Sequence, residues 1–312
     1  MLIKGTRNTG IGTDALRNNT GDCNTDIGSL SLDSNTTGAS NTAMGVSALS
    51  ANTTGGSNTA VGINALLTNT SSTQNTAIGA NSLYTNTGTK NTAVGSASLY
   101  SNTTASNNTA VGYNSLCANT TGAYNLALGV ETLDANSTGE RNTGLGAGAL
   151  TDNTTGCYNV GVGYGSLANN TTANDNVAVG YFSLEANTTG TQNVAVGSCT
   201  LCTNTTGIRN TAVGYFAMCD VAGAGNENTA MGYSAGCTLT TGDENAFLGY
   251  RAGYNVTTGS CNIMIGSSAC IDSGGTNNSI AMGYAVVSIN NAMSFGNGGT
   301  DSRIAFGATS IT

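Results

Sequence analysis

A motif close to Asn-Thr-Ala-Val-Gly returns about every 17 residues along almost the whole chain, and it constrains the fold more than any other feature. Of the sixteen steps between consecutive motif glycines from Gly12 to Gly283, thirteen are 17 residues, two are 16 and one is 18. Two more glycines, Gly296 and Gly307, follow at steps of 13 and 11 residues. A period held this closely indicates a stack of equivalent units. We therefore predict one repeat domain rather than a globular domain built around a pocket.

The composition excludes several function classes. Only 8% of the 312 residues are charged, the formal net charge is -8, and His, Pro and Trp are absent. A mildly acidic chain without basic clusters is a poor partner for nucleic acid or for an anionic membrane surface. No apolar run reaches the roughly 18 residues that indicate a transmembrane helix. We expect neither nucleic-acid binding nor a membrane span.

The repeat itself predicts short strands. Its consensus is Asn-Thr-Ala-Val-Gly-x-x-Ser/Ala-Leu-x-x-Asn-Thr-Thr-Gly-x-x, and we number its positions as slots 0 to 16 from the first Asn. Asn, Gly and β-branched residues disfavour a helix, whereas Thr-x-Val alternation is typical of strands. We interpret Asn-Thr-Thr-Gly as a turn in which Asn and Gly supply positive φ. Two short strands and two turns per repeat then make one coil of a β-solenoid.

The predicted fold class is therefore all-β, a parallel β-solenoid of about 17-residue coils. Coils stack at about 4.8 Å, so seventeen of them would form a rod roughly 80 Å long. We expect an N-terminal lead-in over residues 1–7, the solenoid over residues 8–283 and an irregular C-terminal cap or tip over residues 284–312.

Strand pleating predicts which side chains point into the coil. Slot 3 is always apolar and slot 8 is Leu from Leu16 to Leu201, so we expect these two slots to fill the interior. The small residues of slots 2 and 7, such as Ala43, Ala48 and Ser82, are then expected to face outward. An outward face that stays small over a dozen coils indicates close packing against another surface. We interpret that surface as further copies of the chain in a parallel homotrimer.

The strings NTAVGYNSL, NVAVGYFSL and NTAVGYFAM resemble the repeats of trimeric autotransporter adhesin heads. The resemblance covers nearly the whole chain and implies a left-handed parallel β-roll in which three chains intertwine. Head repeats of that family are shorter, and the extra residues of this chain fall in the Asn-Thr-Thr-Gly turn. Similar repeats occur in tail fibres and surface fibres of phages and large viruses. Because this chain carries no signal peptide, stalk or membrane anchor of an autotransporter, we expect a virion surface or another extracellular appendage as its location.

Aromatic residues mark the candidate binding surface for a host glycan or protein receptor. Rows of tyrosines can stack on sugar rings or on partner proteins, although the same rings could instead shield the turn or the trimer groove. We also expect the C-terminal region from Ser267 to Thr312 to be the binding end, because the period breaks there and Phe295 and Phe306 enter. The tyrosines lie in slot 5: Tyr113, Tyr164, Tyr181, Tyr215, Tyr233, Tyr250 and Tyr284.

Cysteine and asparagine also form columns. Cys202, Cys219 and Cys237 occupy slot 9 of consecutive coils, within disulfide range, so filler thiols, cross-links and a metal site all remain open. The slot 0 asparagines are expected to form a hydrogen-bonded ladder along the stack. The Asn-x-Thr sequons of the turns, such as Asn52-Thr53-Thr54, are interpreted as turn chemistry rather than as glycosylation sites.

We expect a non-catalytic structural fibre or adhesin that attaches multivalently to a host or surface. The absence of His excludes His-based catalysis and His-ligated metals, the scattered acidic residues form no column, and no cofactor is predicted. An ice-binding solenoid is the alternative, but the slot 1 threonines are expected to point inward with slot 3. A β-helical polysaccharide-processing enzyme would need a cleft with gathered acidic or His residues, which the sequence does not show.

Overall fold

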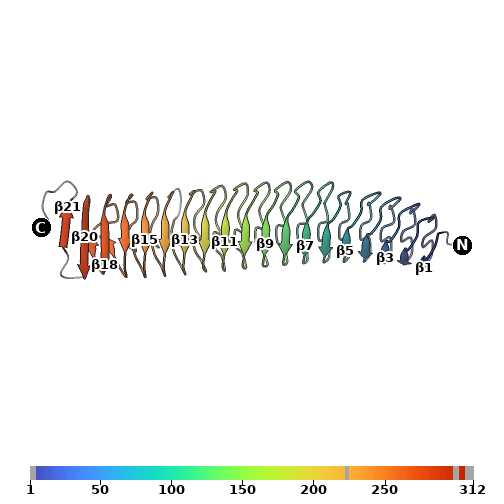
Figure 1. Ribbon diagram of the computed structural model, residues 1–312, viewed down its shortest axis with the longest axis horizontal. Coiled ribbons are helices and arrows are strands. Elements are labelled where there is room, and N and C mark those ends of the chain that lie inside the picture. Colours follow the sequence, from blue (N-terminus) through green and yellow to red (C-terminus); the bar gives the residue numbers. More distant parts are fainter. Residues whose placement is uncertain (1–4, 222–224, 298–301, 306–312) are drawn as a thin grey trace. The chain divides into compact units, whose positions relative to one another are not determined.

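The computed structural model describes residues 5–221, 225–297 and 302–305, and these residues form strands and turns without any helix (Figure 1). The chain divides into two compact units, Met1–Tyr158 and Asn159–Thr312. Each unit is a stack of coils of a parallel β-solenoid, which confirms the predicted fold class. The described part of the chain contains no helix long and apolar enough to cross a bilayer.

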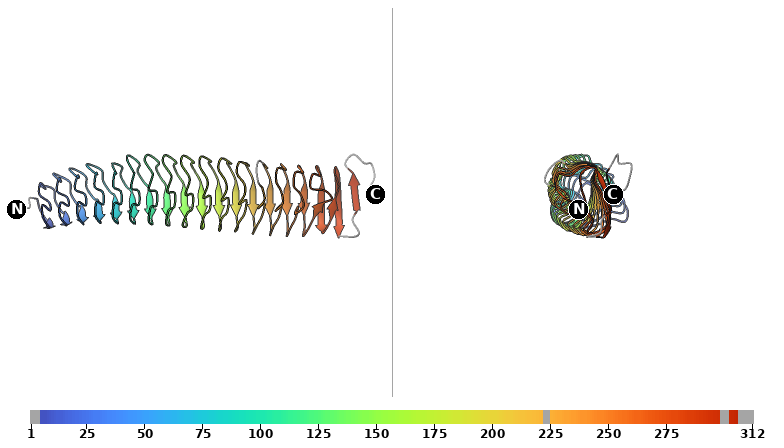
Figure 2. Two further views of the ribbon diagram at one scale, coloured as in Figure 1. Left: turned by 180° about the vertical axis from the view of Figure 1, so that it is seen from behind. Right: turned by 90° about the vertical axis from the view of Figure 1, so that its left-hand side faces the viewer.

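The first unit contributes one three-residue strand from each coil to a parallel sheet (Figure 2). Neighbouring strands pair without any shift in register, so that Thr42 lies beside Thr59, and Ala43 beside Ala60. Equivalent slots therefore form columns along the stack. The strands are β1 (Thr9–Ile11), β2 (Thr25–Ile27), β3 (Thr42–Met44), β4 (Thr59–Val61), β5 (Thr76–Ile78), β6 (Thr92–Val94), β7 (Thr109–Val111), β8 (Leu126–Leu128) and β9 (Thr143–Leu145).

The second unit continues the same pattern and ends differently. Parallel pairing in register extends from β18 into β20, where Gly283 lies beside Gly296. The last strand, β21, then pairs antiparallel with β20. The strands are β10 (Val160–Val162), β11 (Val177–Val179), β12 (Val194–Val196), β13 (Thr211–Val213), β14 (Thr229–Met231), β15 (Ala246–Leu248), β16 (Ile263–Ile265), β17 (Cys270–Ile271), β18 (Ile280–Tyr284), β19 (Val287–Ser288), β20 (Ala292–Asn297) and β21 (Ser302–Ala305).

The prediction of two strands per coil is wrong for the coils of β1 to β15. Within the described ranges, a second strand occurs only in the coils of β16 and β18, where β17 pairs with β19. Elsewhere slots 6 and 8 have positive φ, for example 56° at Asn64 and 53° at Leu66, so the backbone is not extended there. Its amides still bond between coils, because the N–H of Leu66 donates to the carbonyl of Ser82 at 3.0 Å.

The positions of positive φ also differ from the prediction for the Asn-Thr-Thr-Gly turn. Neither Asn52 nor Gly55 of that turn has positive φ; slots 4, 6, 8 and 16 have it instead. At slot 4 only glycine fits: Gly62 has φ 138°, and a Cβ there would lie 2.5 Å from the carbonyl oxygen of Gly79 in the next coil. The conserved spacing of these glycines within the chain thus reflects close approach of one coil to the next.

Leucine in the left-handed region at slot 8 is unusual. Placing an L-residue there costs about 1–2 kcal/mol. The Leu66 side chain is completely buried, and burying a leucine contributes about 1.5–3 kcal/mol. Burial therefore offsets the backbone strain, and the prediction that slot 8 fills the interior is confirmed.

The prediction for the strand faces is wrong and must be inverted. Slots 2 and 7 lie inside: Ala43, Ala48 and Ser82 are completely buried. Slot 3 lies outside, and the side chain of Met44 is 40% exposed. The physical reason is the size of the coil: its interior must hold slot 8 leucines and two columns of asparagine, so most coils have Ala, Gly or Ser beside them. The larger Phe247 occupies slot 2 in a coil where Gly253 replaces the slot 8 leucine. The small side chains of slots 2 and 7 therefore point into the coil, and the larger apolar side chains of slot 3 point to the surface.

Two asparagine ladders complete the interior. At slot 0, the backbone N–H of Asn58 donates to Oδ1 of Asn41 at 3.0 Å, and its Nδ2 donates to the carbonyl of Ser72 at 2.9 Å, which confirms the predicted ladder. A second ladder at slot 11 was not predicted: Nδ2 of Asn52 donates to Oδ1 of Asn35 at 2.8 Å. Because Asn52 is buried, its sequon cannot carry a glycan in the folded chain, in agreement with the interpretation as turn chemistry.

Candidate binding surfaces

The predicted slot 5 tyrosines lie on the surface of the unit to which each belongs. Slot 5 follows the slot 4 glycine, which comes directly after the three-residue strand in most coils. All seven rings are exposed, from 47% at Tyr233 to 65% at Tyr284. Tyr113 belongs to the first unit and the other six to the second.

Consecutive tyrosines stack on one another in the second unit. The ring centroids of Tyr215 and Tyr233 are 5.5 Å apart and those of Tyr233 and Tyr250 are 5.3 Å apart, with interplanar angles of 18° and 13°. Tyr164 and Tyr181 stack at 5.8 Å. Stacking along the column leaves ring edges and hydroxyl groups facing solvent. Such a row offers apolar edges and hydrogen-bonding groups at regular intervals.

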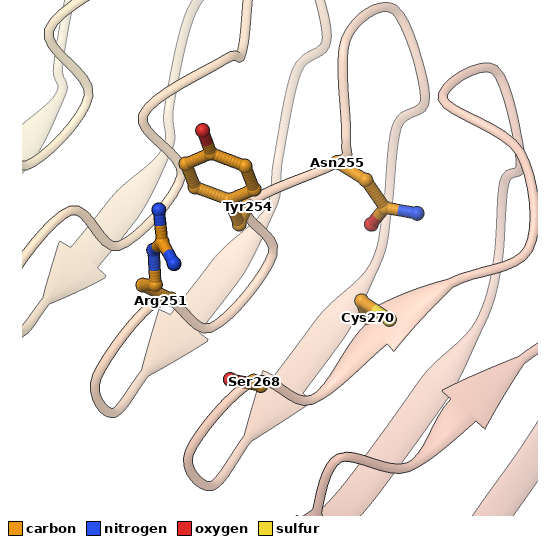
Figure 3. A pocket seen from close by; sticks show the side chains of 5 residues that line it. All are labelled: Arg251, Tyr254, Asn255, Ser268 and Cys270. Atoms are coloured by element: carbon orange, nitrogen blue, oxygen red, sulfur yellow. The ribbon is translucent and has the colours of Figure 1, made fainter.

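A hollow of about 190 Å³ lies beside the end of this column, in the coils of β15 and β16. Its lining includes Arg251, Tyr254, Asn255, Ser268 and Cys270 (Figure 3). The Arg251 guanidinium lies 4.5 Å from the centroid of the Tyr254 ring, which orients its N–H groups. A guanidinium beside an aromatic ring can bind a carboxylate or sugar hydroxyls.

A second aromatic group on the first unit was missed by sequence reasoning. Tyr124, Arg141 and Tyr158 occupy slot 16 of three consecutive coils. The Arg141 guanidinium lies 5.5 Å from the Tyr124 ring and 5.4 Å from the Tyr158 ring, and it donates to the Tyr158 hydroxyl at 2.6 Å. Their common slot was a signal in the sequence that could have revealed this group.

The outward strand face carries a column of apolar side chains in each unit. We call it the apolar strip and define it as the slot 1 and slot 3 side chains of β1 to β9 in the first unit, and of β10 to β16, β18 and β20 in the second. Slot 3 contains Ile, Leu, Val and Met from β1 to β18, and Phe295 takes that place in β20. Phe295 is 36% exposed and thus belongs to the strip, whereas the predicted Phe306 lies outside the described residues.

The apolar strip is slightly hollowed in the second unit. A depression of about 220 Å³ is lined by Met231, Leu248 and Ile265 of slot 3, together with their strand neighbours. The strip carries Thr in slot 1 through most of the first unit, and Val in slot 1 of β10, β11 and β12. The expectation that the slot 1 threonines point inward is therefore wrong, because they share the outward face with slot 3.

Of the three cysteines predicted as a possible cross-link, the structure brings two together. The Sγ atoms of Cys219 and Cys237 are 2.9 Å apart, whereas the thiol of Cys202 donates to the backbone carbonyl of Cys219 at 3.5 Å. All nine cysteines of the chain are free thiols in the structure. The hydrogen bond between Cys219 and Cys237 raises the pKa of the Cys219 thiol and lowers the pKa of the Cys237 thiol. Burial raises the pKa of Cys202 to about 11.

Acidic groups gather only weakly. Asn226, Glu227, Asp243 and Glu244 line a shallow depression, where Asp243 accepts a hydrogen bond from the backbone N–H of Asn226 at 2.7 Å. This acidic depression is not the place where possible metal ligands come closest together. Among the described residues, Cys219, Asp220 and Cys237 have ligand atoms that all lie within 4.8 Å of one another.

Comparison with known proteins adds no relative. No model of a protein family matches the chain, and no curated protein matches its sequence.

Proposed function

We propose that the chain is the structural part of a fibre or adhesin on a virion surface or another extracellular appendage. In this proposal it assembles as a parallel homotrimer through the apolar strip and attaches multivalently to a host glycan or protein receptor. The single observation that carries the proposal is the outward orientation of the apolar strip in each unit. The resemblance of the repeats to trimeric adhesin heads supports the same conclusion.

The chemistry of the apolar strip favours a second copy of the chain as its partner. No charged residue occurs in slot 1 or slot 3 of any strand from β1 to β18. Contiguous exposed apolar surface on a soluble protein usually marks an interaction site, and the absence of charge from the centre is typical of an interface core. Another copy presents the same columns at the same spacing. Cyclic symmetry about an axis along the stack keeps every coil level with its equivalents.

The tyrosine columns supply the proposed contact surface for a receptor. Stacked rings such as Tyr233 and Tyr250 present repeated weak sites, and three copies of each would act together. Linked weak sites bind more strongly than single ones because the second contact is intramolecular. The hollow beside Arg251 adds a cationic group that suits an acidic sugar. A non-catalytic role agrees with the lack of His and with the scattered carboxylates.

Matched lysine substitutions test the assembly. Met44→Lys places a charge in the apolar strip, whereas Thr54→Lys places one in an exposed turn of the same coil. We expect Met44→Lys to lower the native mass measured by light scattering, and Thr54→Lys to leave it unchanged, with both variants keeping the wild-type circular dichroism. Equal native masses for the two variants would contradict the proposed interface.

Receptor binding is tested separately on a glycan array. Tyr233→Ala and Tyr250→Ala should each reduce binding at least several-fold, because each removes a ring from the stacked column without touching the interior. Thr54→Ala serves as the matched surface control. Unchanged binding by both tyrosine variants would remove the column from the proposed contact surface while leaving the trimer intact.

Ice binding is a second candidate function, and the outward orientation of the slot 1 side chains supports it. In the first unit, Thr occupies slot 1 of every strand except β8, in register along the sheet. A flat array of threonine hydroxyl and methyl groups could order surface water, provided that no other chain covers it. A thermal hysteresis assay distinguishes the two functions, since a trimer that buries this face should show no activity.

A further inference from the structure

We propose that Cys219, Cys237 and Asp220 form a binding site for a thiophilic divalent cation of the zinc class. The site lies at slots 9 and 10 of two neighbouring coils in the second unit, away from the apolar strip. It is independent of the proposed fibre function, and neither proposal requires the other.

The two thiols converge more closely than their backbones require. Equivalent residues of stacked coils lie about 4.8 Å apart, the spacing that the strand pairing sets, and side chains in the same rotamer keep that separation. The Sγ atoms of Cys219 and Cys237 are only 2.9 Å apart, so the two side chains turn toward each other. Cys202 also occupies slot 9, in the preceding coil. Its thiol contacts the carbonyl of Cys219 at 3.5 Å, just as the Cys219 thiol contacts the carbonyl of Cys237 at 3.7 Å, so the close thiol–thiol contact is what sets Cys219 and Cys237 apart.

The third ligand comes from the adjoining residue. The Sγ atom of Cys219 lies 3.7 Å from Oδ1 of Asp220. In tetrahedral zinc sites the Zn–S distance is about 2.3 Å and the Zn–O distance about 2.0–2.2 Å. The edges of such a tetrahedron are about 3.7 Å between two sulfurs and about 3.5 Å from sulfur to oxygen. The sulfur–oxygen distance already fits, and a rotation about the cysteine χ1 angles would widen the sulfur–sulfur distance.

The surroundings hold the backbone of the site while leaving an entrance. The N–H of Asp220 donates to the carbonyl of Cys237 at 3.0 Å, and Oγ1 of Thr203 donates to the carbonyl of Cys219 at 2.6 Å. Cys219 is almost completely buried, Cys237 is half-buried and Asp220 is exposed. A cation could thus enter from the carboxylate side and keep a solvent ligand in its fourth position. Two thiolates select zinc-class ions over the hard cations that oxygen ligands prefer.

Cadmium is a direct probe because its thiolate complexes absorb in the near ultraviolet. The full chain, reduced with a phosphine and handled without oxygen, is titrated with Cd²⁺, and zinc is then added as a competitor. We expect one equivalent of Cd²⁺ to bind to the wild type with a thiolate charge-transfer band, and zinc to displace it. Cys219→Ser and Cys237→Ser should each abolish this component, and Asp220→Asn should weaken it at least about tenfold.

Cys202→Ser is the matched control, because it removes a slot 9 thiol that does not converge on the pair. It should retain the band and the stoichiometry of the wild type. Unfolding curves monitored by circular dichroism verify that each variant folds, and Cys237→Ser, at a half-buried position, remains informative if Cys219→Ser unfolds. Cadmium uptake that is the same in the wild type, Cys219→Ser and Cys237→Ser would overturn the proposal, as would the absence of uptake by the reduced wild type.

Discussion

At the scale of single residues, Asp26 departs most clearly from the repeat. It occupies slot 2, where its column neighbours in the paired strands are Gly10 and Ala43. Its side chain is completely buried, and neither carboxylate oxygen has a hydrogen-bond partner of good geometry, although Ser31 and the backbone of Leu16 lie near enough to lower its pKa partly. Burial in this apolar column raises the pKa of Asp26 to about 6. A position that favours a small side chain thus holds an ionisable group whose charged form is destabilised.

The raised pKa predicts how stability depends on pH. The unfolded chain has an aspartate pKa of about 3.9, so between about pH 4 and pH 6 the native state binds more protons than the unfolded state. The free energy of unfolding should therefore fall as the pH rises through this window, by at most about 3 kcal/mol, and then level off. Urea unfolding at several pH values measures this contribution. It is the difference in the free energy of unfolding of the first unit between the wild type and Asp26→Ala.

Asp26→Ala should stabilise the first unit at pH 7 by about 2–3 kcal/mol, because it restores the residue type that fits slot 2 and removes an unpartnered charge. The gain should shrink as the pH is lowered to 4. Asp152→Ala, which removes an exposed carboxylate, should change the stability by less than about 0.5 kcal/mol at either pH. A gain for Asp26→Ala that does not vary with pH would contradict the raised pKa.

At the scale of the single coil, the slot 11 asparagine ladder supports each turn. Asn52 donates to Oδ1 of Asn35 and to the carbonyl of Gly55, and its Oδ1 accepts from Asn69 at 2.9 Å. Replacing Asn52 by Ala removes hydrogen bonds to three coils and leaves Oδ1 of Asn35 without its donor, whereas the carbonyl of Gly55 still accepts from Asn41. We expect a loss of about 3 kcal/mol in the free energy of unfolding of the first unit.

Thr54→Ala is the control for that substitution, because Thr54 is exposed in the same turn. It should change the unfolding midpoint in urea only slightly. If both substitutions lowered the free energy of unfolding equally, the Asn52 side chain would contribute no more to stability than a surface residue. That result would contradict a stabilising role for the buried ladder.

The sequence predicted the period, the parallel coils, the slot 8 core and the slot 0 ladder, because each follows from repetition of a residue type in one slot. The sequence did not predict which strand face points into the coil, because pleating determines which residues share a face but not which face is inside. The presence of two buried asparagines per coil decides that question, and the second of them, such as Asn52, was hidden in a turn motif. The convergence of Cys219 with Cys237 depends on rotamers, which spacing does not specify.

At the scale of the whole molecule, the inverted faces change the reason for expecting assembly. Small residues such as Ala60 serve the interior, so they carry no information about a partner. The exposed Val, Ile, Leu and Met side chains of slot 3 do indicate a partner, because an uncharged apolar strip on the surface of each unit usually marks an interaction site. The exposed slot 5 tyrosines are not part of that strip, and the proposal leaves them available for a receptor when the strip is buried between copies.

The native mass of the purified wild-type chain, measured by light scattering with and without reductant, tests the central claim most directly. We predict a mass three times the 30.9 kDa of the single chain, unchanged by reductant because the apolar strip rather than a disulfide holds the copies together. A mass of 30.9 kDa under both conditions would contradict assembly through the strip and would favour its slot 1 threonines as an ice-binding face.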